Sequence, residues 1–334
     1  MTLLSVRDLE VTITTRAGAL RAVDGLSFDL AAGQSLGIVG ESGSGKTQTA
    51  LAVSGLLPWN ATARGYALFE GADLLRLRTS AMNRIRGAQI AMVFQDPMTS
   101  LNPHLTIGLQ MSEVVERHQK VSRAEGMQRA ADMLERVRLS GAAGALSRYP
   151  HEFSGGMRQR IAIAMMLLCK PRLLIADEPT SALDVTIQSQ ILALLGELQR
   201  DLGLAVILIS HDLGVVADLC SRTLVMYAGR AMESGRTRLL MSHPRHPYTQ
   251  GLLASRLQLE QARRATLPSI PGHAPDLIGP IGGCPFQPRC TQAQEVCARV
   301  RPPARFTPIG TQSACHLEQP EGAARPDGSA TVPS

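Results

Sequence analysis

The sequence predicts an α/β protein with a mostly parallel sheet, followed by a small segment that contains cysteines. Three observations support this prediction. Apolar runs typical of buried strands alternate with helical stretches along residues 1–240. A glycine-rich phosphate-binding pattern directly follows one of those runs. Beyond residue 241, clustered prolines and then four cysteines replace the alternation, which indicates a separate, loop-rich module.

The order of the predicted elements supports a parallel core with additions. Strand-like apolar runs occur at 3–6, 11–13, 26–30, 36–39, 90–94, 173–176 and 205–209. Helical stretches separate the later runs, so we expect a parallel sheet that binds phosphates at the carboxyl ends of its strands. A hairpin that turns at Ala228-Gly229, within 223–233, is expected to end this core.

The chain divides by composition into three parts. We predict a core domain over 1–240, a C-terminal module over 241–317 and a disordered tail over 318–334 that is rich in Pro, Gly, Ala and Ser. Within the core, no strand pattern occurs between 102 and 150, where charged helical sequence dominates. An inserted helical subdomain is therefore expected at about 102–170.

Composition argues against several classes of protein. Aromatic residues make up 3% of the chain, which disfavours nucleic-acid recognition by base stacking. The net charge of +6 is spread along the sequence without a basic block. No apolar run approaches the roughly 18 residues that span a bilayer. Charged residues at Arg7, Asp8 and Glu10 leave no room for a signal peptide, so we expect a reducing compartment and no need for disulfides.

The most informative motif is the sequence GESGSGKT at 40–47, which fits G-x-x-x-x-G-K-[ST] and follows the strand-like run 36–39. Its glycines let backbone N–H groups turn toward a polyphosphate, Lys46 can reach the terminal phosphates, and Thr47 offers a hydroxyl to Mg²⁺. The predicted phosphate-binding residues are Gly40, Glu41, Ser42, Gly43, Ser44, Gly45, Lys46 and Thr47.

Two further patterns point to phosphate chemistry. The strand-like run 173–176 ends in Asp177, which can enter a Mg²⁺ shell, and Glu178, which can polarise an attacking water. Just before it, Ser154 and two glycines begin a helix predicted at 157–168, and a helix start of this kind binds anions.

The stretch Ser154-Gly155-Gly156-Met157-Arg158 resembles the signature sequence of ATP-binding cassette (ABC) proteins. Other family positions match in order: Gln95 resembles the Q-loop glutamine, Asp184 the D-loop aspartate and His211 the switch histidine. The resemblance implies a RecA-like parallel sheet with an antiparallel β subdomain and an inserted helical subdomain.

The same resemblance implies roles for these residues. Catalysis would involve Glu178, His211 and Gln95, and Mg²⁺ would be bound through Thr47, Gln95 and Asp177. Gln95 would join the phosphate loop in the ATP site. In this family two domains pair head to tail, so Ser154, Gly155, Gly156 and Met157 would contact the ATP of the partner.

One position departs from the family pattern. ABC proteins usually place an aromatic side chain near the N-terminus to stack on adenine, whereas this chain has Ile13, Thr14 and Thr15 there. The stacking partner of adenine is therefore left open, with Arg21 and Val23 as alternatives.

The C-terminal cysteines suggest a metal site. Cys284, Cys290, Cys297 and Cys315 are separated by five, six and seventeen residues. Zinc sites usually contain a closer cysteine pair, so an iron–sulfur cluster is favoured over zinc, and two disulfides are a third possibility. The segments 246–253 and 283–290 resemble the C-terminal extension of oligopeptide/dipeptide importer ATPases, some of which carry a four-iron cluster on matching cysteines.

This resemblance implies an ATP-hydrolysing subunit that supplies energy to an importer of dipeptides or oligopeptides. Its partners would be a second ABC ATPase, usually a different sister subunit, two integral-membrane permease subunits and, indirectly, a substrate-binding protein. It would lie on the cytoplasmic face of the inner membrane and contact the permease through 96–103. Three alternatives remain: import of nickel or another small solute, a soluble ATPase that acts on nucleic acid, and a cysteine module that senses redox state.

Overall fold

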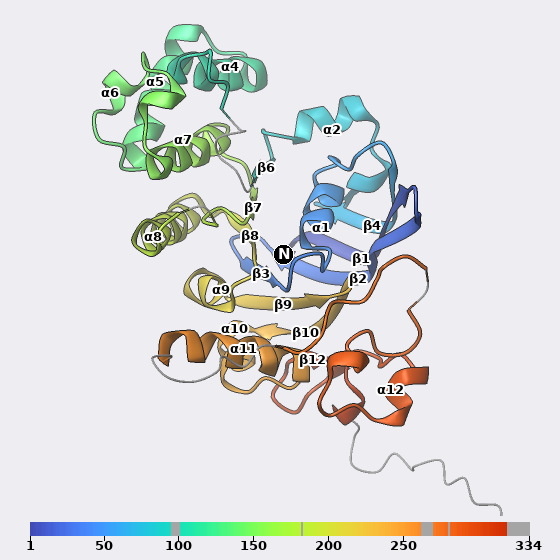
Figure 1. The fold of residues 1–334 in the computed structure, drawn as a ribbon. Helices are drawn as coiled ribbons and strands as arrows, with labels where there is room; N and C mark the ends of the chain where they lie inside the picture. Colours follow the sequence, from blue (N-terminus) through green and yellow to red (C-terminus); the bar gives the residue numbers. More distant parts are fainter. Residues whose placement is uncertain (95–100, 182, 262–269, 280, 319–334) are drawn as a thin grey trace, which may run out of the picture.

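The computed structural model describes residues 1–94, 101–181, 183–261, 270–279 and 281–318. Figure 1 shows an antiparallel sheet formed by the N-terminal strands, a larger sheet at the centre and a group of helices set apart from both. The C-terminal segment packs beside the larger sheet.

The elements alternate as the sequence predicts. The longer strands are β1 (Thr2–Thr15), β2 (Gly18–Ala31), β3 (Ser35–Val39), β4 (Ala61–Phe69), β6 (Ile90–Val93), β7 (Leu173–Asp177), β8 (Ala205–Ser210), β9 (Arg222–Tyr227) and β10 (Arg230–Arg236). Short strands are β5 (Ala72–Asp73), β11 (Arg305–Phe306) and β12 (Gln312–Ser313). The helices are α1 (Lys46–Val53), α2 (Thr79–Ile85), α4 (Ile107–Gln119), α5 (Arg123–Arg136), α6 (Ala142–Ala145), α7 (Gly155–Leu167), α8 (Val185–Leu202), α9 (Leu213–Leu219), α10 (Thr237–Ser242), α11 (Pro247–Gln261) and α12 (Glu295–Arg299).

The larger sheet places the phosphate-binding strand between two neighbours. Its strand order is β11-β12-β10-β9-β3-β8-β7-β6, and the pairs from β9 to β6 are parallel. The strands β3, β7 and β8 are buried at every position, which explains their continuous apolar sequences. Because they are parallel, the residues that follow β3, β7 and β8 meet at one edge of the sheet.

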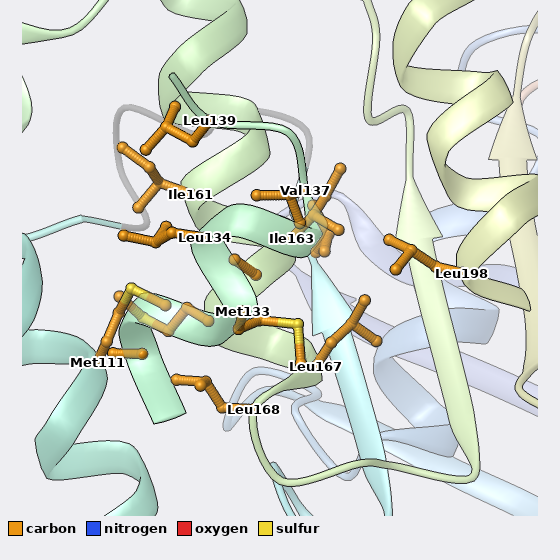
Figure 2. Close-up of a cluster of buried hydrophobic side chains, with 14 of the residues drawn as sticks. Met111, Met133, Leu134, Val137, Leu139, Ile161, Ile163, Leu167, Leu168 and Leu198 are labelled. Atoms are coloured by element: carbon orange, nitrogen blue, oxygen red, sulfur yellow. The ribbon is translucent and has the colours of Figure 1, made fainter. Parts of the chain in front are cut away.

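The helical subdomain has its own apolar core. Helices α4, α5 and α7 lie close together, and Figure 2 shows side chains from these helices and from residues 137–139 meeting in one cluster. Leu134, Val137 and Ile161 are fully buried there. The prediction of a helical insertion is confirmed, because the described part of 101–172 contains helices and no strand.

Two features of the sheets differ from the predicted elements. Strand β4 was not predicted, because Thr62, Arg64 and Gly65 interrupt its apolar pattern, yet it pairs with β1 along much of its length. Strand β12 pairs with β10, so the C-terminal segment extends the core sheet. The division at residue 240 stays a prediction. Helices long and apolar enough to cross a membrane are absent from the part of the chain that the structure describes.

Candidate functional site

The phosphate loop occupies a tight turn between β3 and α1. Gly40 is required because a Cβ there would lie 2.1 Å from the carbonyl oxygen of Met226. Gly45 has a φ of +98°, and its Cβ would lie 2.2 Å from the carbonyl oxygen of Ala22. Both contacts are with backbone, so a side chain at either position would displace the loop.

Lys46 is buried at the start of α1, with 5% of its surface exposed. Its Nζ donates hydrogen bonds to the carbonyl oxygens of Gly40 (2.8 Å) and Glu41 (2.9 Å). Burial lowers the pKa of Lys46, while the nearby charges of Glu178 and Asp177 raise it. The loop therefore holds a cationic group among anionic ones, next to the position predicted for terminal phosphates.

Asp177 and Thr47 supply oxygen atoms suited to a Mg²⁺ ion. Asp177 ends β7, and its carboxylate is hydrogen bonded to the Thr47 side chain. Burial raises the pKa of Asp177. Its Oδ1 is buried and, among the residues described, has no hydrogen-bond partner. A buried carboxylate oxygen beside a hydroxyl is a donor set that fits Mg²⁺, so the residues present agree with the predicted ion.

Glu178 and His211 lie together beside the phosphate loop. The Oε2 atom of Glu178 is 3.3 Å from Nδ1 of His211. Glu178 has a φ of +46°, and its N–H donates to the carbonyl oxygen of Ile209 on β8. This left-handed backbone turns the side chain away from the direction that β7 would give it. His211 is largely exposed and so can reach a bound molecule.

The phosphate loop from Glu41 to Thr47, together with Glu178 and His211, lines one cleft of 780 Å³. Besides the phosphate loop, Glu178 and His211, its walls carry five aliphatic residues: Ile13, Leu20, Ala22, Leu252 and Leu277. Val23 is buried away from it, and Arg21 is not among the lining residues. Leu277 was missed in the sequence because it comes from the C-terminal segment, where no motif marks it. Leu252 belongs to 246–253, which resembles the importer extension, but that resemblance did not assign it to the cleft. Leu277 reaches the cleft because Arg21 N–H donates to Leu277 O (2.9 Å) and Leu20 pairs with Ile278.

The signature residues do not join this cleft. Ser154 is exposed at the start of α7, where its Oγ accepts a hydrogen bond from the Met157 N–H (3.4 Å). Gly156 leaves no space for a side chain, since a Cβ would lie 2.8 Å from Ile187. Asp184 caps α8 through the N–H of Ile187 (3.0 Å). Gln95 lies outside the described residues.

The prediction of a 4Fe-4S cluster on Cys284, Cys290, Cys297 and Cys315 is wrong. Within the described ranges, no group of three or more His, Cys, Asp or Glu side chains is placed to hold a metal ion. The same finding applies to zinc, the alternative metal, within the described ranges. Cys284 packs in an apolar cluster, and burial raises its pKa and that of Cys290, and raises the pKa of Cys315 to about 11. All six cysteines of the chain are free thiols, so the third possibility, two disulfides, is absent as well. The spacing showed four thiols in a short segment, but in the fold Cys284 is buried in the apolar cluster, and Cys290 and Cys297 pack against that cluster as partly buried side chains.

Comparisons with known proteins identify similar families and structures. The ABC transporter family matches residues 23–181, and the family "Oligopeptide/dipeptide transporter, C-terminal region" matches 232–297. The structure resembles the dimeric ATP-binding cassette MJ0796 bound to ADP and Pi, with a TM-score of 0.63 and 25% identity over 70% of this chain and 99% of that one. It also resembles cbiO1 from Clostridium perfringens, with a TM-score of 0.62 and 26% identity over 77% of this chain and 95% of that one.

Two curated relatives match nearly the whole chain. The oligopeptide transport ATP-binding protein OppD of Escherichia coli is 52% identical over 94% of this chain and 92% of its own length. The dipeptide transport ATP-binding protein DppD of Bacillus subtilis is 51% identical over 90% of each. The names of these relatives refer to ATP binding and transport, and neither refers to an iron–sulfur cluster. The chain is an ABC ATPase and belongs to the family of oligopeptide and dipeptide transport ATP-binding proteins.

Proposed function

We propose that this chain binds and hydrolyses ATP to drive an importer of dipeptides or oligopeptides. The observation that carries the proposal is the extent of the match. One chain joins an ABC ATPase cleft to the C-terminal region of oligopeptide/dipeptide transporters, and relatives of both names cover at least nine-tenths of it. A general ABC ATPase would account for the cleft but not for residues 232–297.

The cleft supports a hydrolytic step at the terminal phosphate. Lys46 and the loop N–H groups would bind the β- and γ-phosphates, and Thr47 with Asp177 would hold Mg²⁺, which neutralises phosphate charge when bound. Glu178 would orient and deprotonate the attacking water, whose oxygen bonds to the γ-phosphorus as the bond to the bridging oxygen breaks. His211, 3.3 Å from Glu178, would hold the carboxylate or contact the γ-phosphate. Gln95 is proposed as a further Mg²⁺ and water contact.

A second ATPase would complete the site. Ser154, Gly155, Gly156 and Met157 begin α7 away from the cleft of their own chain, with Ser154 and Gly155 exposed. The helix start offers backbone N–H groups to an anion. Pairing two domains head to tail would bring it to the γ-phosphate of the partner's ATP, with Asp184 nearby. We propose that this partner is a sister subunit.

The aliphatic wall of the cleft would bind the nucleotide base. Ile13, Leu20 and Leu277 line the cleft and would contact a purine by apolar packing in place of the usual aromatic ring. Apolar packing does not distinguish the edges of bases, because these side chains offer no hydrogen-bonding groups. The site is therefore expected to accept GTP as well as ATP.

The remaining partners follow from the proposed role. They are two permease subunits in the inner membrane and a substrate-binding protein, with this chain bound to the cytoplasmic face. Nothing in the described structure favours the alternative solute or nucleic acid as substrate, so both become outcomes of the experiment.

ATP hydrolysis should be measured first for the isolated chain. It should then be measured in membranes that also contain the second ATPase and the permeases encoded by neighbouring genes. Addition of a binding protein loaded with peptide should raise the rate, and the same protein loaded with nickel should not. A rate that does not respond to permease and peptide would contradict the proposal. Stimulation by duplex DNA alone would support the nucleic-acid alternative.

A further inference from the structure

The C-terminal segment contacts the phosphate loop through one arginine. Arg289 lies in a short helix, Gln287–Arg289, and only 6% of its side chain is exposed. Its Nη1 and Nη2 donate to Oε2 (2.6 Å) and Oε1 (3.0 Å) of Glu41, the second residue of the phosphate loop. This two-point contact fixes both the distance and the plane of the Glu41 carboxylate.

Every N–H group of Arg289 has a partner. Besides the two bonds to Glu41, Nε donates to Pro271 O (2.7 Å), Nη2 to Ile270 O (3.2 Å) and Nη1 to Tyr227 Oη (3.2 Å). A guanidinium has five such donors, so its orientation is fully determined. Hydrogen bonding to Glu41 raises the pKa of Arg289 and so keeps the guanidinium charged.

Glu41 is also held through its backbone. Its N–H donates to Tyr248 Oη (2.9 Å) on α11, and its carbonyl oxygen accepts from Lys46 Nζ (2.9 Å). Tyr248 packs with Tyr227 and Phe286, at ring-centroid distances of 4.7 and 5.2 Å. Glu41 thus links the aromatic cluster around Tyr248 and the guanidinium of Arg289 to Lys46, the lysine proposed to bind the phosphates.

We propose that Arg289 is a positioning residue, which holds Glu41 so that the phosphate loop is set for the triphosphate before nucleotide arrives. The C-terminal segment is then part of the ATPase centre. This inference rests on the proposed ATP binding and adds a residue that no motif of the ATPase domain contains. Loss of Arg289 would let the start of the loop adopt other conformations, and part of the binding free energy would be used to order it.

The experiment measures MgATP binding by calorimetry, and steady-state hydrolysis, for the full-length chain and Arg289→Met. We expect the dissociation constant and KM to rise about tenfold, with kcat changed by no more than about twofold. Arg289→Lys, which keeps the charge but not the two-point contact, should recover part of the affinity. The matched control is Arg299→Met, which removes an exposed arginine that pairs with Glu295 in the same segment and should bind normally.

A double variant guards against misfolding. Arg289→Met leaves Glu41 without its partner, whereas Arg289→Met with Glu41→Met removes both charges and is better tolerated. The double variant should bind MgATP no more weakly than the single variant, since both lose the same contact. If either folded variant binds MgATP as the wild type does, the inference is overturned, even if its melting temperature falls. Failure of the wild type itself to bind MgATP would instead contradict the proposed function.

Discussion

Glu178 and His211 lie 3.3 Å apart, Oε2 to Nδ1, although 32 positions separate them in the sequence. The parallel pairing of β7 with β8 sets Asp177 opposite Ile209, and both side chains follow where these strands end. The register of these two strands therefore brings Glu178, the proposed base, next to His211.

Replacing Glu178 by Gln should remove the proposed base while leaving the phosphate loop intact. We expect kcat to fall by about 100-fold or more, with MgATP affinity retained. Single-turnover hydrolysis and calorimetry measure the two quantities. The control is Glu197→Gln. Glu197 lies on α8 and forms an exposed ion pair with Arg138. Normal turnover in Glu178→Gln would remove Glu178 from the mechanism.

His211→Ala should lower kcat by at least about tenfold with a smaller change in KM, because the histidine is expected to act on the reacting phosphate or on Glu178. The variant should add little to the defect of Glu178→Gln, since the two residues act as a unit. His273→Ala, at an exposed position, is the control. Additive losses in the double variant would show that the two residues act independently.

Asp177→Asn should raise the Mg²⁺ concentration needed for half-maximal hydrolysis by at least about tenfold, because a carboxylate ligand becomes a neutral amide. A titration with Mg²⁺ at fixed ATP measures this change. Asp201→Asn, on the exposed end of α8, should leave the titration unchanged. An unaltered Mg²⁺ requirement in Asp177→Asn would argue against the proposed ion site.

Leu277→Asn should weaken ATP and GTP binding alike, by roughly fivefold, because apolar contact with the base is lost. Pyrophosphate binding, which involves no base, should not change. Calorimetric titrations with the three ligands make the comparison, and Leu317→Asn, a partly exposed position, is the control. A loss confined to pyrophosphate would mean that Leu277 affects the phosphate loop and not the base.

Stability should fall in mild acid because of His246. Burial lowers the pKa of His246 to about 4 from its ordinary value of 6.5. Between these values the unfolded chain binds a proton that the folded chain does not, so the free energy of unfolding decreases as pH falls from about 6.5 to about 4. His246→Asn keeps an acceptor for the Tyr248 N–H and should lose this dependence.

Melting temperatures of both proteins across this range provide the measurement. The carboxylate of Glu233 accepts a hydrogen bond from the backbone N–H of His246, and burial raises the pKa of Glu233. The titration of Glu233 therefore increases the free energy of unfolding as pH falls, opposite to the effect of His246. Subtracting the curve of His246→Asn from that of the wild type removes this contribution. His243→Gln, an exposed histidine nearby, should follow the wild-type curve. Equal curves for wild type and His246→Asn would contradict the prediction.

The sequence by itself determined the α/β class, the helical insertion and the chemistry of the phosphate loop. These features depend on local patterns: the continuous apolar run of β3, the glycines beside Lys46, and the acidic pair at the end of β7. Strand β4 escaped prediction because its pairing with β1 compensates for a weak local pattern.

Only the tertiary structure decided which distant residues share the cleft. Leu277 and Arg289 reach the ATPase centre because the C-terminal segment folds back along the core sheet, and no periodicity or motif records such a contact. The cysteines show the converse case. Their spacing suggested a metal cluster, whereas packing and burial, which depend on the whole fold, left them as free thiols. Contacts between residues far apart in the chain cost loop-closure entropy, and the packing of the whole molecule decides which of them form. A local stretch of sequence therefore cannot predict them.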